Sequence, residues 1–138
     1  MIKRVLGRSG IEVSSIGMGC WAIGGPYSHL GNPNGWGTVD DTESLRALAI
    51  GMDMGITFLD TADVYGCGHS EEIIGKAIEG KRDSVILATK FGFTFDRKRR
   101  EITGEWPNHD YITRACESSL RRLKTDYIDL YQYHCGDA

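Results

Sequence analysis

Apolar and polar residues alternate along this chain with two different periodicities, one typical of strands and the other of helices. Short apolar runs bounded by glycine and polar residues predict strands, which we place at residues 3–6, 11–14, 15–19, 56–60, 85–90 and 127–134. Apolar residues at helical spacing predict three helices, which we place at residues 41–55, from residue 70 onward, and from about residue 108 to residue 123. The first two strands form a hairpin, and the predicted order after it is β-α-β-α-β-α-β.

The second predicted helix carries a signal at its N-terminus. Ser70 is followed by Glu71 and Glu72, an order in which the serine hydroxyl can cap free backbone N–H groups while the acidic side chains face the positive end of the helix dipole. We therefore interpret Ser70 as the cap of this helix.

Four polar residues follow the predicted strands. Asp60 ends one strand, Tyr65 comes five residues later, Lys90 ends the next strand and His134 ends the last. Strands joined by helices run parallel, so their C-terminal ends meet at one edge of the sheet, about 4.8 Å from strand to strand. A carboxylate, a phenol, an ammonium and an imidazole at one edge predict a site for acid catalysis.

Two architectures fit this order of elements, a doubly wound open sheet and part of a (β/α)8 barrel. A dinucleotide-binding open sheet places a G-x-G-x-x-G turn between its first strand and first helix. Here the glycines at positions 17, 19, 24 and 25 do not have that spacing, and a long segment intervenes before Asp41. The sequence therefore favours the barrel.

Composition narrows the class of protein. The 138 residues are 41% hydrophobic and 25% charged, and the formal net charge of -3 argues against a general nucleic-acid binder. No apolar stretch approaches the roughly 20 residues of a membrane helix, and the N-terminus lacks the apolar run of a signal peptide, so we expect a cytoplasmic protein without a membrane partner. The four cysteines form no C-x-x-C pair and no metal-ligand pattern, so we expect reduced thiols and no bound metal.

Four stretches of the chain, taken together, resemble the aldo-keto reductase family. They are Gly17-Met18-Gly19-Cys20-Trp21, Asp60-Thr61-Ala62-Asp63-Val64-Tyr65-Gly66, Thr89-Lys90 and Asp129-Leu130-Tyr131-Gln132-Tyr133-His134. In that family an N-terminal hairpin closes the bottom of a parallel (β/α)8 barrel of the TIM type, which also fits the predicted hairpin. Because such a barrel takes about 250 residues, residues 1–138 are expected to be its N-terminal half, with the C-terminal half absent.

The resemblance implies an enzyme that uses NADPH, or NAD, to reduce an aldehyde or a ketone to an alcohol. The implied catalytic tetrad is Asp60, Tyr65, Lys90 and His134. A free tyrosine has a pKa of roughly 10, so an ammonium at Lys90 that favours the phenolate would make Tyr65 a better general acid. Asp60 would pair with Lys90, and His134 would donate a hydrogen bond to the substrate oxygen.

The resemblance also implies contacts to the cofactor. The implied positions are Gly19, Cys20 and Trp21, together with Asp60. Trp21 would lie near the nicotinamide or the wall of the substrate site, although tryptophan also packs in protein interiors, so a structural role stays open for it. Each member of the tetrad, taken alone, is more often structural than catalytic, and only the joint order and spacing favour a site.

Two long segments between the predicted elements are interpreted as loops. Residues 24–40 contain Tyr27, His29 and Trp36 and are predicted to line the substrate pocket. Residues 91–107 contain a run of mixed charge at positions 96–101, which could contact phosphates but is more often a solvated surface. We interpret that run as solvated.

Half of a barrel would leave two open sheet edges and an uncovered apolar interior. We therefore expect a partner for the chain beyond its small-molecule carbonyl substrate. The candidates are a second copy or a missing C-terminal half that completes the barrel. Two other functions stay open, a truncated and inactive half-barrel and a regulatory or binding subunit of the same fold, as in the potassium-channel auxiliary subunits of the family.

Overall fold

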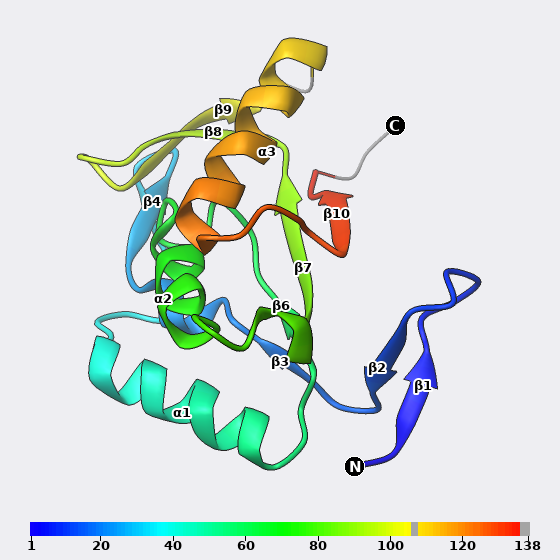
Figure 1. Cartoon of the computed structure of the whole chain (residues 1–138). Coiled ribbons are helices and arrows are strands. Elements are labelled where there is room, and N and C mark those ends of the chain that lie inside the picture. Colours follow the sequence, from blue (N-terminus) through cyan, green and yellow to red (C-terminus); the bar gives the residue numbers. More distant parts are fainter. Residues whose placement is uncertain (106–107, 136–138) are drawn as a thin grey trace.

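The computed structural model describes residues 1–105 and 108–135, and Figure 1 shows a central sheet, a layer of helices and several hairpins beside them. The strands are β1 (Lys3–Val5), β2 (Glu12–Ser14), β3 (Gly17–Gly19), β4 (Tyr27–His29), β5 (Asn32–Asn34), β6 (Phe58–Asp60), β7 (Ile86–Phe91), β8 (Phe93–Asp96), β9 (Glu101–Glu105) and β10 (Leu130–Tyr133). The α-helices are α1 (Asp41–Asp53), α2 (His69–Ala77) and α3 (His109–Leu123), and short 3-10 helices occupy Ala22–Gly24 and Arg82–Ser84.

A parallel sheet in the order β10-β7-β6-β3 forms the centre of the chain. Gly19 at the end of β3 is in register with Asp60 at the end of β6, and Lys90 of β7 is in register with Gln132 of β10. The helices α1, α2 and α3 connect these strands in turn, which confirms the predicted β-α-β-α-β-α-β order. All four strands therefore end at the same edge of the sheet.

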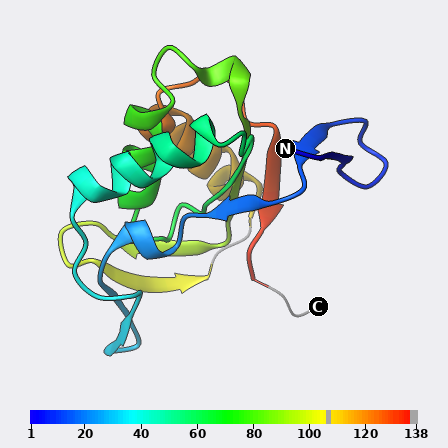
Figure 2. The ribbon, with the colours of Figure 1, turned by 90° about the horizontal axis from the view of Figure 1, so that it is seen from below.

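The helices lie together on one side of the parallel sheet, as the view from below shows (Figure 2). Apolar side chains from both layers fill the space between them, and each contributes about 1.5–3 kcal/mol when fully buried. The leucine and isoleucine side chains that are at most 1% exposed are Leu48, Leu59, Ile73, Ile74, Leu87 and Leu123. Within residues 1–105 and 108–135, no helix is long and apolar enough to cross a membrane.

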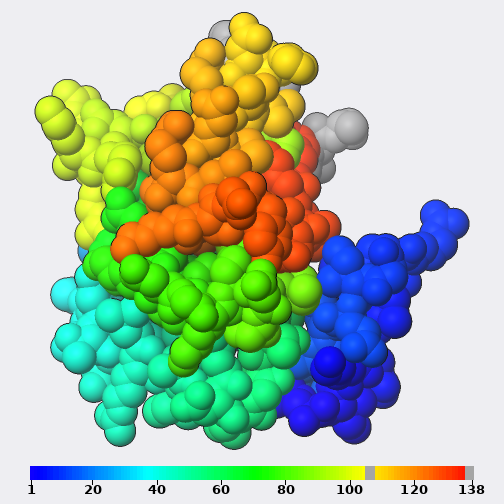
Figure 3. Space-filling view, in the orientation of Figure 1, coloured from blue at the N-terminus to red at the C-terminus, as the bar shows by residue number. Residues whose placement is uncertain are grey.

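The N-terminal hairpin β1–β2 stands beside this layered body and forms a separate lobe in the space-filling view (Figure 3). The backbone N–H of Ser14 donates to Thr57 Oγ1, and the N–H of Thr57 donates to Ser14 Oγ, both at 2.9 Å. Thr57 directly precedes β6. The hairpin is therefore attached at the N-terminal edge of the sheet, opposite the edge that carries Asp60.

The two segments predicted as loops instead form a second sheet, so that prediction was wrong. β4 and β5 form an antiparallel hairpin, β8 and β9 form another, and β4 pairs with β9 to give the order β5-β4-β9-β8. The turn of the first hairpin places Leu30 and Gly31 at φ of 51° and 76°. Pro107, at the end of the second predicted loop, lies outside the described residues.

The run of mixed charge in the β8–β9 turn is exposed at Arg97, Lys98 and Arg99, as predicted, although two of its arginines also bind the body of the protein. Arg97 donates to the Cys67 carbonyl at 3.2 Å and to Glu72 Oε1 at 2.5 Å. Arg100 donates to the Gly24 carbonyl at 3.2 Å. These contacts attach the second sheet to the start of α2 and to the 3-10 helix that follows β3.

Candidate active site

Three of the predicted site residues meet at the C-terminal edge of the parallel sheet. Asp60 is the last residue of β6, Lys90 is the penultimate residue of β7, and His134 directly follows β10. Tyr65 joins them from the turn between β6 and α2. The parallel order of the strands thus brings all four residues to one place.

Lys90 and Asp60 form a hydrogen-bonded ion pair. Lys90 Nζ lies 2.8 Å from Asp60 Oδ2 and donates a second hydrogen bond, also of 2.8 Å, to the carbonyl oxygen of Thr61. The ammonium lies 5.3 Å from the centre of the Tyr65 ring. The Lys90 side chain is only 14% exposed, against 36% for that of Asp60, so the pair is shielded from solvent mainly on the lysine side.

The expected lowering of the Tyr65 pKa by Lys90 is outweighed in this structure by burial and by Asp60. The pKa of Tyr65 is raised from 10.0 to about 12, mainly by burial, and the negative charge of Asp60 contributes to the rise. Lys90 is bound to Asp60, whose negative charge offsets part of the field of the ammonium at the phenol. Tyr65 therefore carries its proton throughout the neutral pH range, which a proton donor requires.

His134 approaches Tyr65 edge-on, with the two ring centres 5.5 Å apart. Burial lowers the pKa of His134, and the positive charge of Lys90 lowers it further. The imidazole is therefore neutral near pH 7. Its Nδ1 atom is buried without a hydrogen-bond partner among the described residues, so Nε2 is the nitrogen that can carry the proton toward the site.

A cavity of about 280 Å³ opens next to Tyr65 and His134. It is lined by Trp21, Tyr27, His29, Asn34, Val64, Tyr65, Phe93, Ile102 and His134. Tyr27 and His29 were predicted to line such a pocket, whereas Trp36 contacts Trp21 at 5.6 Å between ring centres and is not among the lining residues. Asn34 lies in the segment predicted to line the pocket, whereas Phe93 and Ile102 were missed, because they lie on β8 and β9, in a segment that was interpreted as a loop with a solvated charged run.

The predicted cofactor positions next to β3 differ in access. Gly19 is exposed, and no atom would lie within 4 Å of a side chain placed there. Trp21 lines the cavity and donates from Nε1 to the Tyr27 hydroxyl at 3.1 Å. Cys20 is 1% exposed in the apolar core, burial raises the pKa of its thiol to about 12, and its backbone N–H donates to the carbonyl oxygen of Asp60 at 2.8 Å, so the structure leaves Cys20 no free group for a ligand.

The turn that carries Tyr65 is fixed by a close contact between two glycines. Gly66 has a φ of 61°, and a Cβ atom at this position would lie 1.8 Å from the carbonyl oxygen of Gly24. Replacing Gly66 by alanine is therefore expected to push the Tyr65 turn away from residue 24. We predict a loss of about 2 kcal/mol or more in the free energy of unfolding, measured by urea denaturation.

Gly7 provides the matched control for this substitution. Its φ of 57° is nearly the same, but a Cβ atom there would meet nothing within 4 Å. Gly7→Ala should lose only the cost of a left-handed conformation, about 1 kcal/mol. Equal losses for the two variants would show that the contact with Gly24 does not constrain the turn.

Comparison with known proteins gives the family of the chain. The sequence matches the Aldo/keto reductase family over residues 15–138. It is 48% identical over 131 residues to aldo-keto reductase YhdN of Bacillus subtilis. This match covers 94% of this chain and 36% of YhdN. Among solved structures, aldo-keto reductase AKR11C1 from Bacillus halodurans matches with a TM-score of 0.82 and 41% identity over 99% of this chain and 41% of its own.

An aldo-keto reductase from Klebsiella pneumoniae, solved in complex with NADPH, matches with a TM-score of 0.70 and 33% identity over 100% of this chain and 42% of its own. The chain thus spans about two fifths of the length of these structures. The matches confirm the predicted fold class, the first part of a parallel (β/α)8 barrel. The chain belongs to the aldo/keto reductase family.

Proposed function

We propose that the protein takes part in the NADPH-dependent reduction of an aldehyde or a ketone to an alcohol. The observation that carries this proposal is the arrangement at the sheet edge, where Lys90 is bound to Asp60 beside the Tyr65 ring and His134 packs edge-on against that ring. The arrangement provides one protonated phenol and one neutral imidazole, and both can donate to a single carbonyl oxygen.

The residues at the edge of β3 and β6 fit a nicotinamide. Gly19 leaves open space for a planar ring to approach the backbone, Trp21 offers an aromatic surface, and the Asp60 carboxylate is partly exposed beside them. When bound, the reduced nicotinamide supplies the hydride that no side chain can donate. The complex of the Klebsiella pneumoniae relative with NADPH supports that cofactor, and NAD stays the alternative.

Each of the remaining steps belongs to a side chain of this protein. His134 orients the substrate by donating from Nε2 to the carbonyl oxygen, and Tyr65 donates its phenolic proton to the same oxygen as negative charge develops there. The phenolate left on Tyr65 is stabilised by the ammonium of Lys90, 5.3 Å from the ring centre. Asp60 holds that ammonium in place through the 2.8 Å hydrogen bond.

We also propose that a further part of the barrel pairs with β10. β10 is an edge strand of the parallel sheet, and the relatives extend well beyond the part that this chain matches. The added strands could come from a second copy or from a companion segment. Light scattering on the purified chain tests the first source, since a monodisperse monomer that unfolds cooperatively would exclude self-association.

The reductase proposal is tested in a chimera in which this chain replaces the matching 131 residues of YhdN. We expect the chimera to bind NADPH with a saturable change in nicotinamide fluorescence and to oxidise it when a small aldehyde is added. YhdN itself serves as the positive control. A folded chimera that binds NADPH but turns over no aldehyde or ketone would contradict the proposed roles of this chain's residues.

A further inference from the structure

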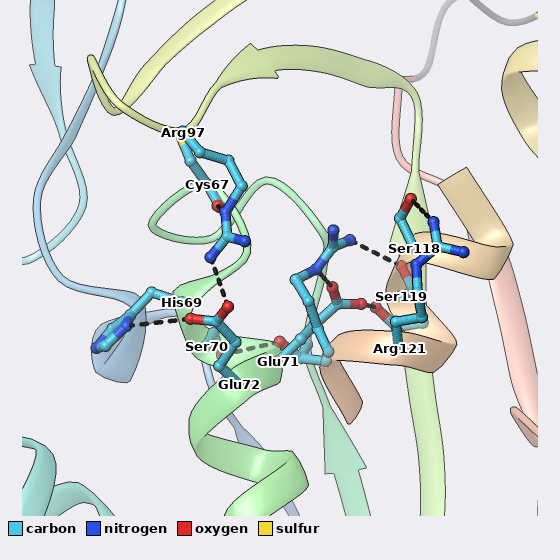
Figure 4. A network of polar contacts seen from close by, with 12 residues as sticks. Cys67, His69, Ser70, Glu71, Glu72, Arg97, Ser118, Ser119 and Arg121 are labelled. Carbon is cyan, nitrogen blue, oxygen red and sulfur yellow. Dashed lines mark hydrogen bonds and ion pairs between the residues drawn. The ribbon is translucent and has the colours of Figure 1, made fainter. Parts of the chain in front are cut away.

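Two consecutive residues at the start of α2, Ser70 and Glu71, are fully buried although both are polar, each with 0% of its surface exposed. Burying a polar or charged side chain is unfavourable unless its hydrogen-bonding groups are satisfied. Ser70 was interpreted as a helix cap, but the cap is Gly68, and the Ser70 side chain makes no capping hydrogen bond. Figure 4 shows both residues inside a network of polar contacts between α2 and α3.

Ser70 connects three segments that surround the site. Its backbone N–H donates to the carbonyl oxygen of Tyr65 at 3.2 Å, and its hydroxyl donates to the carbonyl oxygen of Cys20 at 2.7 Å. The Ser70 hydroxyl also lies 2.8 Å from the hydroxyl of Thr61. A serine hydroxyl has one proton, which goes to Cys20 here, so Thr61 must be the donor to Ser70. Ser70 thus joins the ends of β3 and β6 to the Tyr65 turn.

Glu71 connects β7, the strand that carries Lys90, to α3. Its Oε1 atom accepts a 2.7 Å hydrogen bond from the hydroxyl of Thr89, and its Oε2 atom accepts a 2.6 Å hydrogen bond from Arg122 Nε. Arg122 in turn donates to Ser119 at 3.2 Å, within the same helix. Glu71 thus fixes the side chain that directly precedes Lys90 in β7.

The anchored threonines lie next to the catalytic candidates in sequence but point the other way. Successive side chains of a strand face opposite sides of the sheet, so Thr89 faces the helices while Lys90 faces the site. Thr61 follows Asp60, and its carbonyl oxygen accepts a hydrogen bond from Lys90 Nζ. Hydrogen bonds that hold the two threonines on the helix side therefore also fix the orientation of the neighbouring Asp60 and Lys90 on the site side.

We propose that Ser70 and Glu71 are positioning residues, which hold the Asp60–Lys90 ion pair and the Tyr65 turn in their reactive arrangement by bonding Thr61, Thr89 and Cys20 from the helix side. The catalytic relevance of this network rests on the proposed function. The structural part of the proposal is that the hydrogen bond between Thr89 and Glu71 restrains the Lys90 ammonium, and this part can be tested without measuring catalysis.

The test uses the full 138-residue chain and needs no cofactor. Thr89→Val removes the hydroxyl that donates to Glu71 and leaves the ion pair of Glu71 with Arg122 intact, whereas Glu71→Ala would leave Arg122 buried without its partner and is unsuitable. The readout is the proton exchange rate of the Lys90 ammonium, followed by NMR on ¹⁵N-lysine-labelled protein. We expect Thr89→Val to accelerate this exchange roughly fivefold, the effect of losing about one hydrogen bond from the restraint.

Three further variants make the result specific. Thr89→Ser keeps the hydroxyl and should restore slow exchange, and Ser70→Ala should accelerate exchange as Thr89→Val does. Thr57→Val is the control, because Thr57 binds Ser14 at the opposite end of the sheet, so its loss lowers stability without touching the network. The proposal is overturned if Thr57→Val changes Lys90 exchange as much as Thr89→Val, or if the wild-type ammonium already exchanges as fast as an exposed lysine.

Discussion

Replacing Tyr65 by phenylalanine in the YhdN chimera is expected to lower kcat/KM for an aldehyde by about 10²–10⁴-fold, the usual contribution of a positioned general acid. The pKa of Tyr65 is raised to about 12, so the hydroxyl holds its proton until negative charge develops on the substrate oxygen. Phenylalanine keeps the ring that contacts Trp21 and His134 but has no proton to give. Stopped-flow or steady-state oxidation of NADPH measures the loss.

Tyr27→Phe is the matched control, since it removes a hydroxyl from the same cavity. The Tyr27 hydroxyl accepts a hydrogen bond from Trp21 at 3.1 Å, so its loss should lower kcat/KM by about tenfold or less, in keeping with one neutral hydrogen bond. NADPH affinity should be nearly unchanged in both variants. If Tyr65→Phe retained the wild-type rate, or if both tyrosine variants lost the same activity, Tyr65 would not be the acid.

The sequence predicted the parallel sheet and the meeting point of the site because both depend on local patterns. Apolar runs of strand length alternate with apolar residues at helical spacing, and that order alone requires parallel strands. Asp60 and Lys90 then fall at strand ends that share one edge, where the structure places them 2.8 Å apart. Helix α3 was located well for the same reason, since Asn108 accepts the N–H of Tyr111 as a helix cap should.

The second sheet was missed because two of its strands, β4 and β5, carry no strand-like pattern. β5 consists of Asn32–Asn34 with a proline in the middle, and β4 pairs with β9, which is more than 70 residues away in the sequence. Such a pairing depends on tertiary contacts such as that of Arg100 with Gly24, which no local window of sequence contains.

The misassignment of Ser70 has a different cause. A serine followed by two glutamates is typical of a helix N-terminus, but the same hydroxyl can satisfy other buried groups. Here the turn residue Gly68, with a φ of 96°, starts the helix, and Ser70 is left to bond Thr61 and Cys20. Whether the hydroxyl caps the helix or binds other groups depends on which polar groups pack against the helix N-terminus, and only the folded structure shows these.

Asp63, three residues beyond Asp60, is expected to make stability depend on pH in the direction opposite to that of an ordinary aspartate. It is 2% exposed, and burial raises its pKa from 3.8 to about 8, with the Glu71 carboxylate adding to the rise and Arg122 opposing it. Between these two pH values the folded protein keeps a proton that the unfolded chain releases. The free energy of unfolding therefore falls as the pH rises through this window, by up to about 1.4 kcal/mol per pH unit.

Asp63→Asn removes this titration while keeping the size of a neutral carboxyl group. Relative to wild type, the free energy of unfolding of the variant should rise steadily from pH 4 to pH 8, by several kcal/mol in total. Outside this window the difference should be constant, because Asp63 then binds the same number of protons in the folded and the unfolded wild-type chain. Urea denaturation at four or five pH values measures this difference.

Asp129→Asn is the control of opposite sign, because Asp129 binds Arg82 at 2.7 Å and the loss of this ion pair should destabilise the protein at neutral pH. A stability difference for Asp63→Asn that does not change with pH would show that Asp63 is ionised in the folded chain.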